Sequence, residues 1–345
     1  MPSRAAPRPA PPGAGPRTSR GVARAVAAVL AALAAGRAGA QMTAATAASL
    51  LCERAMDGTR FPDAKARMQA MATDGASKDA AFARGCLLMG EDRFDKAADE
   101  FERAVASDQA SAAYHFQLGQ AYGSRAQHVN VFRQAVLARK TKAEFDRAVA
   151  LDPDLIDARV GLLSYYLYAP GIVGGSVEKA RVQAGEIRRR DAYRGGVAFA
   201  QIATHEKDGV GAARELEALT QQFPDSTGPY VALATGYGQR GLWPDAWAVA
   251  DRFARTLPNS PVAHYLVGRL AGESGQQLDR GAAALAQYLQ GTPREGDPPL
   301  AVAHWRLGAV YERQAKKDAA RAEYEAALRL DPRLAGAREA LGKLR

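Results

Sequence analysis

Histidine is the first residue type to test for chemistry, and the chain holds five histidines. His205 is followed by Glu206, which is the first half of the helical motif that zinc proteases use. That motif needs a second histidine four residues after the first, so that both rings lie on one face of the helix. Position 209 is a glycine. The sequence therefore predicts no protease-type zinc site.

Three further histidines, His115, His264 and His304, open the same pattern of apolar and small residues. Equivalent positions in stacked units would lie roughly ten ångströms or more apart, whereas zinc ligands lie about 2 Å from the metal. No serine lies in a nucleophile elbow, and no cysteine lies in a catalytic motif. We therefore expect no catalytic residue, no metal, no cofactor and no enzymatic activity.

One glycine-rich loop, Ala169–Ser176, precedes a segment with helical character. The amides at a helix N-terminus can hold an anion. The loop lacks the Lys-Ser/Thr pair of a phosphate-binding loop and follows no strand. We expect an extended turn with Ser176 as the N-cap, and a ligand contact is the alternative.

Cys52 and Cys86 are the two cysteines, too few for a disulfide framework or a cysteine-built metal cage. An oxidising compartment would permit a bond between them. Equivalent positions in neighbouring helical units are often farther apart than the Cα separation of about 4.4–6.8 Å that a disulfide needs. Two buried thiols are the favoured interpretation, and a disulfide is the alternative.

The first 40 residues contain six arginines and no acidic residue, and the rest of the chain is left with 40 basic against 37 acidic residues. Bulk charge therefore gives little support for a nucleic-acid partner. An apolar run of 11 residues, 25–35, precedes Ala38-Gly39-Ala40. This order is typical of a secretory signal peptide, and the run is too short to span a bilayer, which needs about 20 residues. We expect residues 1–40 to be a disordered signal peptide, cleaved after Ala40 on export to the periplasm. An uncleaved amphipathic arm is the alternative.

The remainder of the chain repeats itself. The last unit carries, in order, His304, Leu307, Gly308, Tyr311, Ala320, Tyr324, Ala327 and Pro332. The same spacings return in units that begin at Tyr230 and, 34 residues earlier, at Gly196. Less complete copies begin at His264, His115 and Gly85.

Each unit has the pattern of two amphipathic helices. A small residue in the first helix lets the second helix approach, and a large residue fills the space beside it. Proline opens the next unit because it cannot continue a helix. One hairpin cannot bury both of its apolar faces, so neighbouring hairpins must stack. The sequence therefore predicts an all-α protein of stacked helix pairs.

This pattern resembles the tetratricopeptide repeat (TPR) family over residues 79–334. The resemblance implies a right-handed superhelical α-solenoid of TPR helix hairpins. Seven units are expected, at 79–111, 112–155, 156–195, 196–229, 230–261, 262–299 and 301–334. Residues 41–78 are expected to form N-terminal capping helices, and the solenoid over 79–345 is expected to end in a C-terminal capping helix at 334–344.

A closer resemblance covers about 70 residues, from Gly119 through an insertion at 124–140 to the run Tyr165-Tyr-Leu-Tyr-Ala-Pro-Gly-Ile-Val-Gly-Gly-Ser176. This stretch is similar to a group of exported proteobacterial TPR proteins of unestablished function. The similarity supports export and a bacterial origin, and it implies no chemistry.

The resemblance also implies a concave groove lined by residues of the first helices. The expected partner-binding residues are Phe116, Gln120, Gln201, His205, Tyr265, Arg269, Trp305, Arg306, Glu312 and Arg313. The C-terminal third combines aromatic and charged side chains, as binding hot spots do. Packing of Tyr265 and Trp305 against the next repeat is the alternative. Chaperone-binding members of the family carry Lys and Asn at positions that Val197, Val231 and Thr235 occupy in this sequence. The resemblance therefore does not imply chaperone binding.

The expected function is an exported, non-enzymatic scaffold that binds a peptide or helix of an envelope protein in its groove. The alternatives are a self-assembling structural solenoid and an enzyme with its site in the insertions at 124–140 and 169–176. No nucleic-acid partner and no membrane span are expected.

Overall fold

The computed structural model describes residues 43–344 apart from 59, 76, 78 and 295. These residues form seventeen α-helices and one short 3-10 turn, and no strand occurs among them. The expected signal peptide at 1–40 lies outside the described residues.

Seven helix hairpins follow one another along the chain. They are α4 (Ala80–Gly90) with α5 (Phe94–Ser107), α6 (Ala112–Ala126) with α7 (Val131–Leu151), α8 (Ile156–Tyr168) with α9 (Val177–Arg190), α10 (Ala192–His205) with α11 (Gly209–Gln222), α12 (Thr227–Gln239) with α13 (Trp243–Thr256), α14 (Pro261–Ser274) with α15 (Leu278–Leu289), and α16 (Leu300–Arg313) with α17 (Lys317–Leu330). α2 (Ala44–Met56) and α3 (Pro62–Thr73) precede the hairpins, and α18 (Ala335–Lys343) follows them. The 3-10 turn η1 (Gly171–Val173) lies between α8 and α9.

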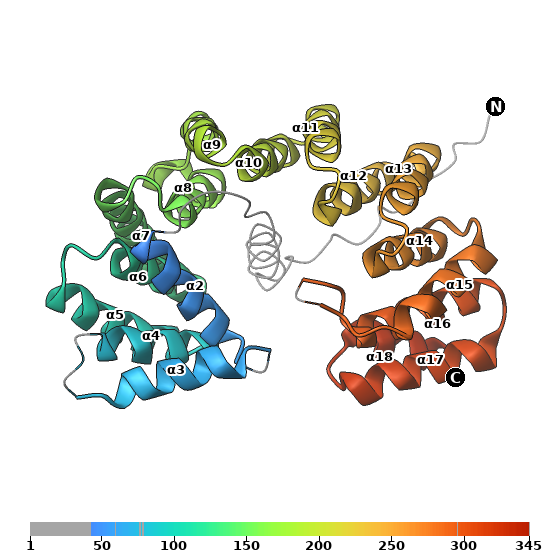
Figure 1. Cartoon of the computed structure of the whole chain (residues 1–345), viewed down its shortest axis with the longest axis horizontal. Helices are drawn as coiled ribbons and strands as arrows, with labels where there is room; N and C mark the ends of the chain where they lie inside the picture. The colour runs from blue at the N-terminus through green and yellow to red at the C-terminus, as the bar shows by residue number, and fades with distance from the viewer. Residues whose placement is uncertain (1–42, 59, 76, 78, 295, 345) are drawn as a thin grey trace, which may run out of the picture.

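The hairpins stack side by side into an open arc (Figure 1). The first helices α8, α12 and α14 face the middle of the arc, and the second helices α9, α11, α13 and α15 lie on its outside. Each helix packs on its hairpin partner and on the neighbouring hairpin. The predicted all-α solenoid is therefore confirmed.

The contact between a small residue and a large residue inside each hairpin has the predicted form. A Cβ atom added to Gly308 would lie 2.5 Å from Cε1 of Tyr324, and one added to Gly119 would lie 2.7 Å from Cδ1 of Phe145. Non-bonded carbon atoms need about 3.5 Å or more. Glycine at these positions therefore lets each second helix seat a ring against the backbone of the first helix.

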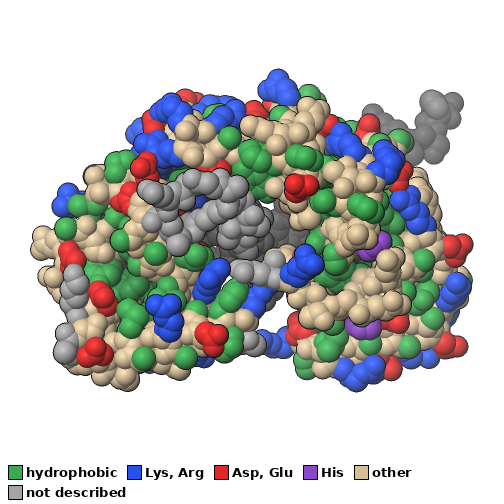
Figure 2. Space-filling model, in the orientation of Figure 1, with side chains coloured by type: hydrophobic (Ala, Val, Ile, Leu, Met, Phe, Trp, Pro, Cys, Tyr) green, Lys and Arg blue, Asp and Glu red, His purple; other side chains and the backbone are tan. Residues whose placement is uncertain are grey.

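Ion pairs connect successive second helices along the outside of the arc. Arg252 of α13 donates to both carboxylate oxygens of Glu217 of α11, at 2.5 and 2.8 Å. This pairing lowers the pKa of the Glu217 carboxyl from its ordinary value. Figure 2 shows Lys and Arg side chains beside Asp and Glu side chains along this rim. Such exposed pairs each contribute about 0–1 kcal/mol, so the buried contacts between hairpins supply most of the stability.

Helix α2 lies toward the inside of the arc, against α4 and α6 (Figure 1). Cys52 of α2 and Cys86 of α4 are fully buried and joined in a disulfide, with their Cα atoms 5.3 Å apart. This corrects the favoured interpretation of two thiols. That interpretation took α2 to stand one repeat away from α4, whereas α2 packs directly on it.

The two ends of the arc also touch. The guanidinium of Arg60, in the loop between α2 and α3, donates to the carbonyl oxygen of Arg294, in the loop between α15 and α16, at 2.7 Å. This hydrogen bond joins residues that are 234 positions apart in the sequence. A loop near the N-terminal end of the arc therefore contacts a loop near its C-terminal end.

Candidate functional site

Two of the expected groove residues belong to hairpin cores. Tyr265 is 8% exposed, and its ring lies 5.5 Å from the ring of Tyr288 in the same hairpin. Phe116 is 1% exposed and lies 5.9 Å from Phe145. Each ring fills the space between its own two helices, and the expectation that these residues contact a partner stays a prediction.

Trp305 holds the C-terminal helix in place. A Cβ atom added to Gly336 of α18 would lie 2.7 Å from Cζ2 of Trp305, so the indole packs directly on the α18 backbone. The guanidinium of Arg306 also lies over the indole, 4.4 Å from its centre. The alternative that Trp305 packs on the following helix is therefore the one that the contacts support.

The charged residues of the C-terminal third bind one another. Arg269 and Arg306 both pair with Oε1 of Glu273, at 2.9 and 3.2 Å, and Arg313 donates to the Glu273 carbonyl oxygen at 3.2 Å. These contacts join α14 to α16. The side chains are engaged in holding two repeats together before any partner arrives.

Glu312 is also engaged, as the acceptor of a hydrogen bond of 2.7 Å from the hydroxyl of Tyr324. Burial, and next the hydrogen bond to Glu312, raise the pKa of the Tyr324 hydroxyl above its ordinary value. The hydroxyl therefore stays a donor at physiological pH. The Glu312 contact joins α16 to α17 within one hairpin, whereas a similar hydrogen bond of 2.6 Å from Tyr122 of α6 to Glu102 of α5 joins two neighbouring hairpins.

A pocket of about 290 Å³ lies between α6, α7 and α8. The α6 helix contributes Phe116, Gly119, Gln120, Gly123, Ser124 and Ala126, and Gln127 follows it. The α7 helix contributes Gln134, Ala138, Thr141 and Phe145. The α8 helix contributes Asp157, Val160, Gly161, Ser164, Tyr165 and Tyr168, and Ala169 and Pro170 follow it. Two expected groove residues, Phe116 and Gln120, are among them. Both insertions contribute to its walls.

Glycines and the long helix α7 together create this pocket. Gly119 and Gly161 face the ring of Phe145 from α6 and α8, and a Cβ atom at either would lie within 3 Å of that ring. Gly123 differs, because a Cβ atom there would meet nothing closer than Thr141 at 3.6 Å. A methyl group would therefore fit at Gly123 without displacing a neighbour, and Gly123 lines the pocket. α7 has 21 residues, against 12 to 14 in the other second helices, and its added turns wall the pocket.

Tyr168 forms the rim of the pocket toward the next hairpin. Its side chain is 48% exposed. Nε2 of Gln201 on α10 donates to the Tyr168 hydroxyl at 3.3 Å, and the ring of His205 lies edge-on at 5.5 Å. The predicted groove residues Gln120, Gln201 and His205 are thus brought to one stretch of surface across α6, α8 and α10. Tyr168 was missed from the sequence, although the tyrosine run before the glycine-rich loop could have indicated it.

The pocket offers neutral hydrogen-bonding groups rather than free charge. Among the pocket walls that the structure describes, Asp157 is the one charged residue, and it is paired with Arg194, which is 6% exposed. The hydroxyl of Tyr165 donates to the carbonyl of Val173, and burial raises its pKa. What remains is a mostly apolar cavity edged by amide and hydroxyl groups, which suits an uncharged side chain.

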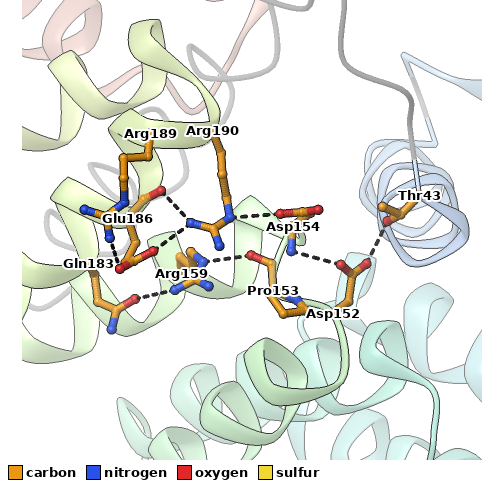
Figure 3. A network of polar contacts seen from close by, with 9 residues as sticks. All are labelled: Thr43, Asp152, Pro153, Asp154, Arg159, Gln183, Glu186, Arg189 and Arg190. Atoms are coloured by element: carbon orange, nitrogen blue, oxygen red, sulfur yellow. Dashed lines mark hydrogen bonds and ion pairs between the residues drawn. The ribbon is translucent and has the colours of Figure 1, made fainter.

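A network of polar contacts fixes the start of α8, and hence the pocket wall (Figure 3). Arg159 is 7% exposed and donates to the Pro153 carbonyl at 2.9 Å. Arg190 of α9 pairs with Asp154 at 2.9 Å. The hydroxyl of Thr43, the N-cap of α2, donates to Asp152 at 2.8 Å. The turn between α7 and α8 is thus held from both sides.

The glycine-rich loop forms a turn. The Ser176 amide donates to the Tyr166 carbonyl at 2.8 Å, and the Ser176 hydroxyl accepts from the Lys179 amide at 3.3 Å as the N-cap of α9. The loop therefore closes one end of the pocket by its own hydrogen bonds.

Two of the three histidines that share one repeat position, His115 and His304, also share a contact. Nδ1 of His115 and Nδ1 of His304 each lie 2.6 Å from a glutamate of the second helix of the same hairpin, Glu144 and Glu323 respectively. The described residues contain no group of three or more His, Cys, Asp or Glu side chains placed to hold a metal. These histidines are best explained as hairpin contacts.

Comparisons with known proteins agree with this architecture. Residues 301–334 match the family model described as a tetratricopeptide repeat, and no curated protein matches the chain. The yeast Tom70 crystal structure is similar with a TM-score of 0.55 at 12% identity, over 94% of this chain and 72% of that chain. A tetratricopeptide repeat protein from Parabacteroides merdae gives a TM-score of 0.47 at 15% identity, over 78% of this chain and 99% of that chain. Residues 301–334 are therefore similar to a tetratricopeptide repeat, and the likeness to Tom70 shows that the described chain shares the fold of a helical solenoid.

Proposed function

We propose that the protein is an exported scaffold that binds a segment of a partner protein on the inner surface across α6, α8 and α10. The observation that carries the proposal is the pocket beside Gly123, which opens between two first helices and is bordered by Gln120 and Tyr168. TPR solenoids bind peptides and proteins, so a cavity on the helices that face the hollow is the natural place for a partner side chain.

The chemistry of the site indicates what the partner segment presents. An apolar side chain would enter the pocket, because its walls are mostly apolar and its one carboxylate is paired with Arg194. The amide of Gln120 and the edge formed by Gln201 and His205 would then meet polar groups of the same segment. The inner surface already accepts a helix of its own chain, since α2 packs on α4 and α6. This packing supports a helix or a peptide as the bound form.

The periplasm is the proposed compartment, on the strength of the signal-peptide pattern at 1–40 and the disulfide between Cys52 and Cys86. The described residues contain no helix that could span a bilayer. An envelope protein is therefore the proposed source of the partner segment.

An enzyme is the second reading of the pocket, because both insertions line it. The walls that the structure describes pair no serine with a histidine and present no two carboxylates facing each other. A neutral cavity without such a pair fits binding better than acid–base chemistry, so the scaffold remains the proposal.

Site-specific crosslinking tests this function. A photoreactive amino acid would replace Gln120, Gln201, Arg313 or the outward-facing Gln287, and crosslinked partners would be identified in envelope fractions. The proposal predicts one shared partner from positions 120 and 201 and none of it from position 287. A partner captured only from position 313 would move the site to the C-terminal repeats, and capture of the chain itself would favour self-assembly.

A further inference from the structure

Helix α2 lies on the inner side of the arc and covers part of α4 and α6 (Figure 1). It precedes the first hairpin, so it is an addition to the stack rather than one of its paired helices. Ala45, near the start of α2, packs on the core cluster that contains Phe116 and Phe145, two residues that line the pocket. α2 therefore lies next to the surface proposed for the partner segment and shares α6 with it.

The packed face of α2 is made of small side chains. Its four buried residues are Thr46, Ser49, Cys52 and Ala55. The larger apolar residues of α2, Leu51 and Met56, are only partly buried. By contrast, α4 buries Phe82 and Met89. Small side chains remove little apolar area from water, so burial alone holds α2 less firmly than it holds α4.

Buried polar atoms on α2 and α6 lack partners. The Ser49 hydroxyl of α2 and both amide atoms of Gln117 on α6 have no hydrogen-bond partner within the described part of the chain. Both residues are 0% exposed. A buried polar group that is left unpaired costs free energy. The seat of α2 on the inner surface is therefore a compromise, because it leaves an amide of α6 unsatisfied.

Gln117 belongs to the face of α6 that leads to the pocket. Ala113, Gln117 and Gln120 share one face of α6 by helical spacing. Gln120 lines the pocket, and Ala113 packs in the core cluster that includes Cys52 of α2. This face therefore runs from the core cluster beneath α2 to the pocket. A partner helix on it would meet Gln117 one turn away from Gln120.

The disulfide from Cys52 to Cys86 fastens α2 to α4. With the proposed cleavage after Ala40, α2 is attached covalently at two places, which are this bond and the loop that leads to α3. We infer that α2 is a removable occupant of the inner surface, locked over α4 and α6 by the disulfide. Reduction of the bond frees this surface for a partner helix that pairs a polar side chain with Gln117. This second step rests on the proposed function.

A dithiol reductant opens the lock by thiol–disulfide exchange. Its first thiolate attacks one sulfur of the bond, and the other cysteine leaves as a thiolate. Its second thiolate then attacks the mixed disulfide, which releases the remaining cysteine and closes the reductant's own disulfide. Two electrons and two protons pass to Cys52 and Cys86, and no other reactant is needed. Because both cysteines are fully buried, the first attack requires α2 to lift.

Hydrogen exchange measured by mass spectrometry tests the lock in the full chain. Dithiothreitol should raise the exchange rate of the α2 amides by roughly tenfold or more, whereas α18, at the other end of the arc, should exchange as before. Cys52→Ala with Cys86→Ala should show the faster exchange without reductant, and dithiothreitol should then change nothing. Unchanged exchange of α2 after complete reduction would overturn the inference. Equal gains throughout α4 to α6 would also overturn it, because the bond would then stabilise the whole region rather than α2 alone.

Binding of the partner segment that is crosslinked from positions 120 and 201 tests the second step. The reduced chain should bind this segment roughly tenfold or more tightly than the oxidised chain, because only the open form lets it extend over α4 and α6. Gln117→Ala should weaken binding to the reduced chain and leave binding to the oxidised chain unchanged. Equal affinity of the two forms would contradict the lock over the partner surface. Failure to capture any partner would contradict the proposed function instead, and the exchange measurement would still decide whether α2 is removable.

Discussion

The inner surface near α6, α8 and α10 and the inner surface near α14 and α16 are built from the same repeat, yet they use it differently. In the first region Gly123 lines a pocket and Tyr168 is half exposed. In the second region Glu273 gathers three arginines. The difference shows that aromatic and charged composition alone does not locate a binding surface, because such side chains bind one another when neighbouring repeats bring them together.

The largest expected effect comes from comparing two glycines of first helices. Gly308→Ala should destabilise the protein by about 1–3 kcal/mol, because the new methyl group meets the ring of Tyr324. Gly123→Ala should stabilise it by up to about 1 kcal/mol, because alanine favours a helix and the new methyl group would meet only Thr141, at an ordinary contact distance. Urea unfolding of both variants measures the two changes. Destabilisation of similar size in both would mean that a methyl group does not fit at Gly123.

A smaller effect is expected from the polar contacts of the two regions. Glu273→Ala should lower the free energy of unfolding by about 1 kcal/mol, because Arg269 and Arg306 lose their shared, partly exposed acceptor. Gln201→Ala should change it by less than about 0.5 kcal/mol, as expected for a surface contact. Thermal unfolding followed by circular dichroism compares them. If Gln201→Ala proved the more destabilising, Gln201 rather than Glu273 would hold neighbouring repeats together, which would contradict the comparison.

The hairpins were predictable from the sequence because their determinants are local. The spacing of Gly308 and Tyr324, and of Gly119 and Phe145, places a small residue opposite a large one in every copy, and the structure packs each pair as predicted. A period of 34 residues then requires stacking, since no hairpin buries both of its faces.

The candidate site was less predictable because it depends on contacts between repeats. The sequence placed Trp305 in the groove, whereas in the structure its indole packs against Gly336 of α18. Tyr168 gained its place from Gln201 and His205, which belong to the next hairpin. The disulfide depended on the direct packing of α2 on α4, which the repeat spacing does not specify. Spacing along the chain defines each hairpin, and it says little about which side chains of different hairpins meet.

Filling the pocket tests the central claim most directly. Gly123→Val should occupy the space beside α6, and Gly236→Val on α12, where a Cβ atom would meet nothing within 4 Å, is the matched control. Affinity for the crosslinked partner segment would be measured by calorimetry, with far-UV circular dichroism to show that both variants fold. We predict at least a tenfold loss for Gly123→Val, the value of about one excluded apolar side chain, and less than about a twofold change for Gly236→Val. Equal affinity in both variants would contradict the claim that this pocket holds the partner.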